Sequence, residues 1–487
     1  MIFNSLTFLV FMVLAVALYW SLGTKWRLWM IFLMSLVFYG FWRVEFIGVM
    51  LLSTVTDYFV SLELGKDKHS PKTRKRLLII SLTVNLGLLF IFKYLLFFAD
   101  NTISLINWLG WSVNDVTWKI ILPLGISFYT FQTLSYTIDV YRRHYEPVRN
   151  FALYASYVTF FPQLVAGPVL RAAEVVEQLK RRPTFQLPYI EQGLKRILYG
   201  LFLKVVLADN IAPIVDTGFG IDATQYGGLD VWTLSFLFGM QIYFDFAGYS
   251  HIAIGCAKLM GIEFPENFNF PYAARSFKEF WKRWHISLSS WIRDYLYLPL
   301  AGIKVLSTES RSKGGLNVTE GTRKSKNTAL FLTWAIMGFW HGANWTFILW
   351  GIYHSVMIFA ERLINKLTVK RSIKINKRVA WIATLGFAML GWVPFRAENL
   401  GDAFTMFSKI FIPSTYLQMA MRENVYLITA LITLLVIAAY ELDRVAKRYD
   451  WEQSLVFAPA QVLKYTTMIV LVYIFFRPIN QFIYFQF

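Results

Sequence analysis

Long apolar runs alternate with short polar loops along most of this chain. Runs long enough to cross a bilayer predict membrane helices at 6–22, 28–43, 46–64, 77–98, 119–141, 230–260, 344–363, 379–396, 424–441 and 462–480. Three apolar pieces are too short for comfortable spans at about 1.5 Å rise per residue, and we expect re-entrant or tilted segments at 151–170, 190–207 and 328–340. Together these runs predict roughly ten to thirteen membrane helices.

The polar loops carry a charge pattern that predicts the orientation of the chain. Lysine and arginine gather in 65–76, 142–150, 304–326, 366–378 and 443–449, whereas 99–117 contains neither. Basic loops stay in the cytoplasm, so both termini are predicted to lie outside. The apolar start of the chain lacks a basic segment before it, and we interpret it as a retained first span.

The segment 275–299 has a different pattern. Its apolar residues recur at steps of four and three, which predicts one apolar face of a helix: Phe277, Trp281, Trp284, Leu288, Trp291 and Tyr295. Charged residues make the rest of the helix polar: Lys278, Lys282, Arg283, Arg293 and Asp294. A helix of this kind is expected to lie in the membrane interface or half-buried against the bundle.

Composition agrees with this pattern. Of the 487 residues, 56% are hydrophobic and only 16% are charged, and a soluble protein of this size could not bury so much apolar surface. The chain is therefore predicted to be an all-α polytopic membrane protein. No long polar linker interrupts it, so we expect a single domain, 1–487. The net charge of +18 sits in short loops, which indicates contact with anionic lipid headgroups rather than with nucleic acid.

His341 is the first candidate for chemistry, in the stretch "GFWHGANW" (338–345). It follows a short apolar piece and is expected to lie within the membrane, where ionisable groups usually mark a pathway or an active site. Gly338 and Gly342 would let another backbone or a substrate approach, and Asn344 would orient a ring nitrogen or a substrate carbonyl. A histidine that only packs helices together is the alternative.

Two further segments place polar groups among apolar residues. His285 lies at the edge of the apolar stripe of 275–299 and is expected to face inward. Asp245 lies in "QIYFDFAGYSHIAIG" (241–255), and a carboxylate at that depth needs a partner. Either Asp245 orients a catalytic imidazole or it holds two helices together. Arg293 is a candidate for binding a phosphate group of a donor.

Motifs of several other chemistries are absent from the sequence. It contains no zinc-ligand spacing, no P-loop, no dinucleotide fingerprint and no Gly-x-Ser-x-Gly elbow. Pro and Gly at membrane depth in 122–141 and 161–171 indicate a protein-enclosed cavity. What remains is one or two histidines in a membrane cavity, which suits general-base activation of a hydroxyl or a thiol.

The ordered motifs resemble those of the membrane-bound O-acyltransferases, in particular the bacterial polysaccharide-acetylating branch. The likeness is carried by "LPLGISFYTFQTLSYTIDVYR", "VAGPVLR", "YFDFAGYS", "FWKRWHISLSSWIRDYLYLPL", "GFWHGANWTFILWGIYH", "GWVPFRAENL" and "QFIYFQF". The resemblance implies a ring of helices around a funnel and tunnel, in the cytoplasmic (inner) membrane of a bacterium. It also implies transfer of an acetyl group from a thioester donor, such as acetyl-CoA, with no bound cofactor or metal.

The resemblance also assigns roles to residues. His341 matches the principal catalytic histidine of the family, and His285 matches its second histidine position. The tunnel or its support would include Trp340, Asn344, Asp245, Tyr243, Tyr249 and Arg293. Two positions depart from the third motif, since Ala247 and His251 stand where the family usually has Ser and Asp. An extracytoplasmic partner of the serine-hydrolase-like (SGNH) type is implied, because this chain contains no such domain.

Several functions stay open from the sequence. The preferred acceptor is an extracytoplasmic polysaccharide such as alginate. Alternatives within the class are acyl or D-alanyl transfer to teichoic acid and acetylation of peptidoglycan or cellulose. A proton-coupled transporter that uses His341 and Asp245 as a relay is the alternative from another class, although the sequence shows no internal repeat.

Overall fold

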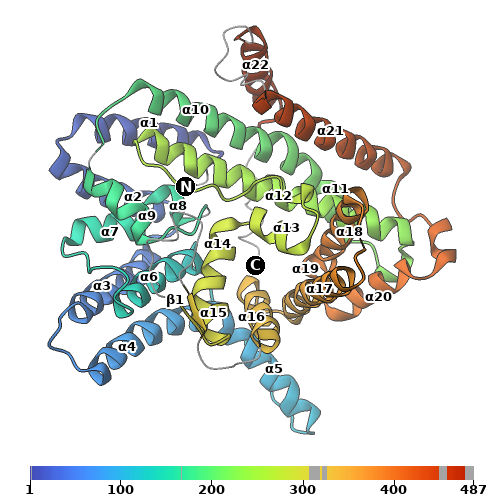
Figure 1. Ribbon diagram of the computed structural model, residues 1–487, viewed down its shortest axis with the longest axis horizontal. Coiled ribbons are helices and arrows are strands. Elements are labelled where there is room, and N and C mark those ends of the chain that lie inside the picture. The colour runs from blue at the N-terminus through green and yellow to red at the C-terminus, as the bar shows by residue number, and fades with distance from the viewer. Residues whose placement is uncertain are drawn as a thin grey trace.

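Helices make up most of the computed structural model. The structure describes residues 1–305, 318–320, 326–448 and 458–477, apart from positions 2, 166, 182 and 374. Within these residues one short ribbon occurs, in which β1 (Ile303–Val305) pairs antiparallel with β2 (Val318–Glu320). Figure 1 shows α10 and α12 along one side, α2, α3, α4, α6 and α7 on a second, α17 to α20 on a third, and α13, α14 and α16 between them.

The first three predicted spans are confirmed as helices. They are α1 (Leu6–Ser21), α2 (Thr24–Gly40) and, after a 3₁₀ turn η1 (Val44–Phe46), α3 (Ile47–Leu64). The Ser5 side chain accepts the backbone N–H of Phe8 and so caps α1, as serine commonly does at a helix start.

The predicted span 77–98 is part of a longer helix. It begins at Pro71 after the Ser70 cap and runs through α4 (Pro71–Leu89), the π-helical turn η2 (Phe90–Tyr94) and α5 (Leu95–Trp108). The continuous helix has 38 residues. This helix therefore connects the basic loop 65–70 with the loop after residue 108.

The predicted span 119–141 is helical only in its second part. The helix α6 (Ile126–Tyr141) begins after Pro123 and Gly125, and Gly125 has a φ of 71°. A Cβ at Gly125 would collide with the carbonyl oxygen of Leu164, so glycine is required twice over there. The next helices are short, as predicted for 151–170: α7 (Phe151–Thr159) and α8 (Phe161–Leu164). The helix α9 (Ala172–Arg181) follows them and was not predicted.

The prediction of a short piece at 190–207 is wrong. Here α10 (Leu187–Leu201), the π-helical η3 (Phe202–Ala208) and α11 (Asp209–Phe219) form one apolar helix of 33 residues. Asp209 follows the predicted piece in the sequence, but its carboxylate lies 2.8 Å from Nζ of Lys204, and the helix continues through it. The inner face packs against α12 (Gly228–Leu259), which follows the short turn η4 (Ala223–Gln225).

The single helix predicted for 275–299 is also wrong. After η5 (Pro271–Ala273) the chain forms α13 (Phe277–Arg283), α14 (Ile286–Ile292), the π-helical η6 (Arg293–Tyr297) and α15 (Leu298–Leu300). His285 at the break has a φ of 40°. The backbone N–H of Ile286 donates to the Asn267 carbonyl at 2.9 Å, so a neighbouring loop replaces the helical hydrogen bond that periodicity alone predicts.

The second half of the chain follows the predicted runs. Its elements are α16 (Lys326–His341), α17 (Trp345–Lys370), α18 (Lys377–Leu390), α19 (Trp392–Arg396), α20 (Leu400–Ile410), η8 (Pro413–Leu417), α21 (Glu423–Arg448) and α22 (Ala458–Phe475). Residues 478–487, with the "QFIYFQF" motif, and most of the basic loop 304–326 lie outside the described residues.

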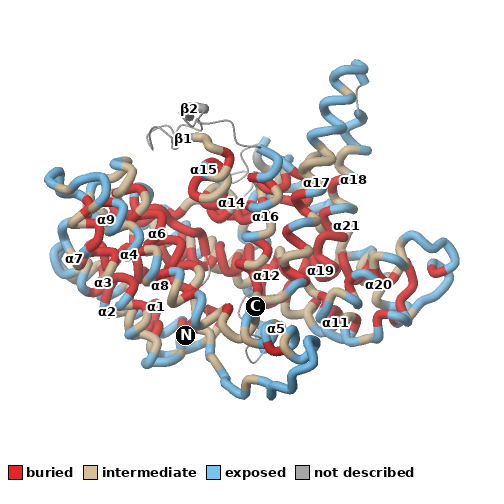
Figure 2. The backbone as a smooth tube through the Cα atoms, turned by 90° about the horizontal axis from the view of Figure 1, so that it is seen from below, coloured by how far each residue is buried: buried red, intermediate tan, exposed pale blue. Residues whose placement is uncertain are grey.

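The helical lengths and hydropathies are those of a multi-pass membrane protein. Seven helices within the described ranges are long and apolar enough to cross a bilayer: Val44–Leu64, Pro71–Trp108, Leu187–Phe219, Trp345–Lys370, Lys377–Arg396, Glu423–Ala446 and Ala458–Phe475. The total of ten to thirteen stays a prediction. Buried positions lie towards the middle of the molecule, on α6, α12 and α19, and exposed ones dominate its two ends (Figure 2).

Candidate functional site

His341 is the last residue of α16, and its side chain is buried, with 5% of its surface exposed. Its ring centroid lies 4.8 Å from those of Trp340 and Trp350 and 5.3 Å from that of Phe395. The imidazole is thus held among aromatic side chains of α16, α17 and α19. The side chain of His341 is therefore inside the protein, and its depth within the membrane stays a prediction.

The residues around His341 in the sequence hold α16 close to α17. A Cβ at Gly338 would collide with the carbonyl oxygen of Phe347, and one at Gly342 would collide with the Phe347 ring. Glycine is therefore needed for helix packing at both positions. The Asn344 side chain caps α17 by accepting the N–H of Thr346 at 3.0 Å. Its amide fixes the direction of the chain just after the histidine.

His285 is also buried, with 1% exposed, and it occupies the break between α13 and α14. Its Nδ1 lies 3.1 Å from Oδ1 of Asn267. That oxygen also accepts the Ser287 hydroxyl at 2.8 Å, while Nδ2 of Asn267 donates to Ser250 Oγ at 3.0 Å. Because Oδ1 is an acceptor in this network, Nδ1 of a neutral His285 ring carries the hydrogen, and Nε2 carries the lone pair.

The second ring nitrogen of His285 is available for chemistry. Nε2 is buried and has no hydrogen-bond partner among the residues that the structure describes. The ring packs edge-on against Phe246 at 4.6 Å. An imidazole held through Nδ1, with Nε2 free to accept a proton or a hydrogen bond, is the arrangement that a general base or a substrate-orienting histidine needs.

Aromatic side chains of α6 connect the surroundings of the two histidines. The ring of Phe128 lies 6.4 Å from the rings of both His285 and Trp340. One turn further along α6, Phe131 stacks between Trp340 at 4.9 Å and Trp291 at 4.0 Å. The structure therefore brings His285, from the break between α13 and α14, to the same interior region as Trp340 and His341 at the end of α16.

Asp245 pairs with a lysine that sequence reasoning did not consider. Nζ of Lys204 lies 2.7 Å from Oδ1 of Asp245 and 2.8 Å from Oδ1 of Asp209. Lys204 lies in η3, and its Nζ is 5.8 Å from the centroid of the Tyr249 ring. This buried ion pair joins η3 to α12. It agrees with the interpretation in which Asp245 holds two helices together. Tyr243, on the same helix, packs against Tyr272 and Trp284 at 5.6 and 6.2 Å.

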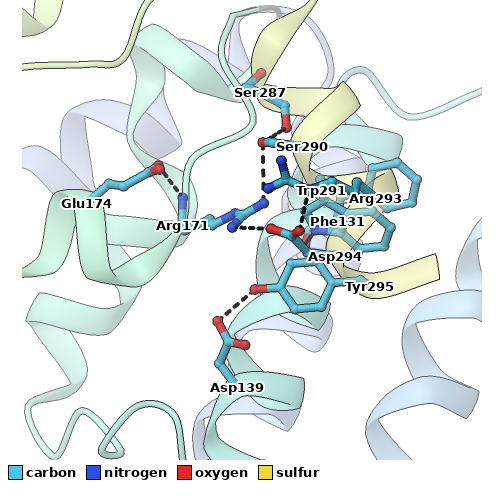
Figure 3. Close-up of polar contacts among 10 residues, drawn as sticks. All are labelled: Phe131, Asp139, Arg171, Glu174, Ser287, Ser290, Trp291, Arg293, Asp294 and Tyr295. Carbon is cyan, nitrogen blue, oxygen red and sulfur yellow. Dashed lines mark hydrogen bonds and ion pairs between the residues drawn. The ribbon is translucent and has the colours of Figure 1, made fainter. Parts of the chain in front are cut away.

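Arg293 belongs to a polar cluster at the end of α14, drawn in Figure 3. Its Nε donates to Oδ1 of Asp294 at 2.7 Å, and Nη1 of Arg171 lies 2.8 Å from the other oxygen of that carboxylate. Asp294 and Arg171 are buried, whereas 47% of the Arg293 side chain is exposed. Tyr295 donates to Asp139 at 2.6 Å beside them. Arg293 is thus the member of this cluster that can reach a ligand.

Three partners of the site residues were not found from the sequence. Asn267 and Lys204 lie outside the motifs that the sequence offers, and Arg171 ends the motif "VAGPVLR" without any sign there of its partner. A signal did exist for Lys204, since a lysine among apolar residues at membrane depth calls for a carboxylate. Asn267 lies in a loop, and nothing in the sequence pairs it with His285.

Metal chemistry finds no support in the described part of the chain. No group of three or more His, Cys, Asp or Glu residues there is placed to hold a metal ion. The site consists of imidazoles, aromatic rings and a nearby arginine.

Comparison with known proteins agrees with this arrangement. The model of the membrane-bound O-acyltransferase family matches residues 149–398, which contain both histidines. The "Probable alginate O-acetylase AlgI" of Azotobacter vinelandii is 37% identical over 464 residues, which cover 94% of this chain and 87% of the relative.

Relatives with other acceptors in their names are similar over less of the chain. The "Peptidoglycan O-acetyltransferase" of Helicobacter pylori is 38% identical over 404 residues, 77% of this chain and 72% of the relative. The "Teichoic acid D-alanyltransferase" of Streptococcus thermophilus is 31% identical over 277 residues, 54% of this chain and 64% of the relative. With its family match, its apolar helices and its two buried histidines, the chain belongs to the membrane-bound O-acyltransferase family and is an acyltransferase.

Proposed function

We propose that this acyltransferase moves an acetyl group from a cytoplasmic thioester across the membrane, for O-acetylation of an extracytoplasmic polysaccharide such as alginate. The observation that carries the proposal is the burial of His341 and His285 in one interior region, reached from separate elements. The similarity to alginate O-acetylases over 94% of the chain supports the choice of acetyl group and acceptor.

In the proposed reaction His341 is the general base. It takes the proton of the acceptor hydroxyl as the oxygen attacks the thioester carbonyl carbon. The C–O bond forms, the C–S bond breaks, and the proton returns to the departing thiolate. A buried ring among Trp340, Trp350 and Phe395 favours the neutral form that a base requires.

The other site residues have supporting roles in the proposal. His285, held through Nδ1, orients the acceptor or the donor with Nε2. Arg293 presents an exposed guanidinium for a phosphate of the donor, acetyl-CoA being the simplest donor of this kind. An extracytoplasmic partner of the serine-hydrolase-like type passes the acetyl group to the polymer, and the membrane is the inner membrane of a bacterium.

Acetylation of peptidoglycan is the second candidate, because the relative from Helicobacter pylori is as similar in identity, at 38%. Its match covers less of this chain, 77% against 94% for the alginate relative. Polymers isolated from a strain that lacks this protein would distinguish the two, since only the true acceptor would lose its acetyl esters.

The test uses membrane vesicles from the native host, which contain the chain together with its partners, supplied with radiolabelled acetyl-CoA. We expect label in the polysaccharide with the wild-type protein. His341→Ala and His341→Gln should each lower the rate per folded molecule by roughly 10²–10⁴-fold. Glutamine keeps a hydrogen bond but cannot accept and return a proton. Near-native incorporation with His341→Gln would show that His341 is a packing residue.

A further inference from the structure

Lys93 is the only charged residue between positions 77 and 98, and it lies in the long helix that precedes the site. Its Nζ donates to the carbonyl oxygens of Trp340 at 2.7 Å and of His341 at 2.9 Å. Nζ also lies 5.7 Å from the centroid of the Trp340 ring. A single ammonium group therefore contacts both of the peptide groups that flank His341.

The contact with Lys93 lies at the C-terminal end of α16. Trp340 and His341 are the last two residues of α16, and the last carbonyls of a helix have no N–H partner within it. The C-terminal end of a helix also carries a partial negative charge, which a cation stabilises. Gly342 follows directly, so the backbone beyond the histidine is intrinsically free to rotate. Lys93 restrains the helix end at this point.

The local structure of the long helix directs Lys93 to α16. Lys93 lies in η2, a π-helical turn, and such turns are frequent at functional sites. Beside it, the ring of Tyr94 stacks on Phe339 at 4.5 Å, and Phe97 lies 5.4 Å from the same ring. These contacts hold η2 and α5 against α16. Figure 1 shows α5 next to α16.

Lys93 forms no ion pair with the residues that the structure describes. Its hydrogen-bond acceptors there are the carbonyl oxygens of Trp340 and His341. Keeping an ammonium group among apolar helices is costly. A purely structural contact between helices could be made by a neutral donor at lower cost. An ammonium group is favoured over a neutral donor if it has to hold the backbone on both sides of His341.

We propose that Lys93 is a positioning residue for the reaction: by binding the carbonyls of Trp340 and His341, it fixes the last turn of α16 and with it the direction of the His341 imidazole. The inference rests on the proposed role of His341 as the base. Lys93 itself does not touch the reacting atoms. A displacement of about 1 Å at a reacting group can cost about 10²-fold in rate, so this restraint would matter for catalysis.

The test compares Lys93→Met and Lys93→Arg in membrane vesicles with radiolabelled acetyl-CoA, with rates expressed per folded molecule. Lys93→Met should lower kcat by about tenfold to hundredfold and leave KM for acetyl-CoA unchanged. Lys93→Arg should recover most of the rate, because a guanidinium can also donate to two carbonyls. Lys195→Met serves as the control, since Lys195 is a lysine on α10 that pairs with Glu191 at the surface, and it should leave kcat unchanged.

Other outcomes separate this inference from the proposed function. If His341→Ala loses the activity but Lys93→Met keeps the native kcat, the role of Lys93 is overturned and that of His341 stands. If His341→Ala keeps the native rate, both proposals fall. A lower melting temperature of Lys93→Met with a native kcat would assign Lys93 to stability alone. Should Lys93→Met not fold, Lys93→Gln replaces it, and an unchanged kcat in that variant would overturn the proposal.

Discussion

Nδ1 of His285 and Oδ1 of Asn267 lie 3.1 Å apart, at the point where the helix expected from the sequence is interrupted. The same asparagine uses its backbone carbonyl to accept the N–H of Ile286 at 2.9 Å. One residue therefore sets both the backbone direction after His285 and the orientation of its ring. Since Asn267 is buried and bonded on both sides of its amide, the relationship is rigid and open to test.

Replacing Asn267 should test whether the orientation of the His285 ring matters for the reaction, because His285 itself is kept. In Asn267→Ala the Nδ1 atom loses its acceptor, and the ring is free to turn or to change tautomer. We expect kcat to fall by about tenfold to hundredfold in the vesicle assay. Ser250→Ala, which removes only the partner of Nδ2, is the control and should keep most of the rate. A native kcat in folded Asn267→Ala would mean that His285 needs no such support.

Asp294→Ala should destabilise the protein strongly. Asp294 is buried and pairs with Arg171 on one side and Arg293 on the other, so its loss leaves a buried guanidinium without its carboxylate. Breaking such a pair costs about 3–5 kcal/mol, to be measured as a lower melting temperature in detergent. Glu191→Ala breaks the exposed pair with Lys195 and should cost less than about 1 kcal/mol. Equal effects of the two variants would contradict the burial argument.

Asp245→Asn should distinguish a structural from a chemical role of this carboxylate. Its partner Lys204 would keep Asp209 but lose one of its two carboxylates. We expect a lower melting temperature, by the equivalent of about 1–3 kcal/mol, and an unchanged kcat per folded molecule. Asp216→Asn, at the more exposed pair with Arg396, is the matched control. A loss of kcat without a loss of stability would instead assign Asp245 to the reaction.

Trp284→Lys should reduce the amount of folded protein. The Trp284 ring is buried, stacked on Phe280 at 5.7 Å and 4.9 Å from Trp392. An ammonium at this place would have no water around it, and burying a charge without a partner costs several kcal/mol. Trp284→Phe keeps an aromatic ring and should retain most of the folded yield. Detergent-stable monodisperse protein from the lysine variant, as abundant as the wild type, would refute the prediction.

The orientation of the chain can be read from the two ends of one helix. Lys68 precedes and Leu105 lies near the end of the continuous helix Pro71–Trp108. Cys256 is fully buried and should give little background labelling. With an impermeant thiol reagent added from outside, Leu105→Cys should be labelled and Lys68→Cys should not, because the basic loop stays in the cytoplasm. The reverse pattern would place both termini in the cytoplasm.

The sequence by itself determined most of the long helices, the class of protein and the two candidate histidines. Runs such as 6–22, 46–64 and 424–441 were recognisable because a bilayer demands about 20 consecutive apolar residues, and the helices α1, α3 and α21 follow them. The motifs around His285 and His341 sufficed to predict the family, which the comparison confirmed. Those features depend on neighbouring residues along the chain.

The tertiary structure alone decided what holds the histidines. The carbonyl that accepts the N–H of Ile286 at the break belongs to Asn267 in a neighbouring loop, and the Lys93 ammonium that donates to the His341 carbonyl comes from 248 residues away. The helix at 187–219 likewise continues past Asp209, whose carboxylate pairs with Lys204 at 2.8 Å. Hydrophobic periodicity reports the burial of each position but not the identity of its neighbour. A polar contact between distant segments exists only once the helices have packed.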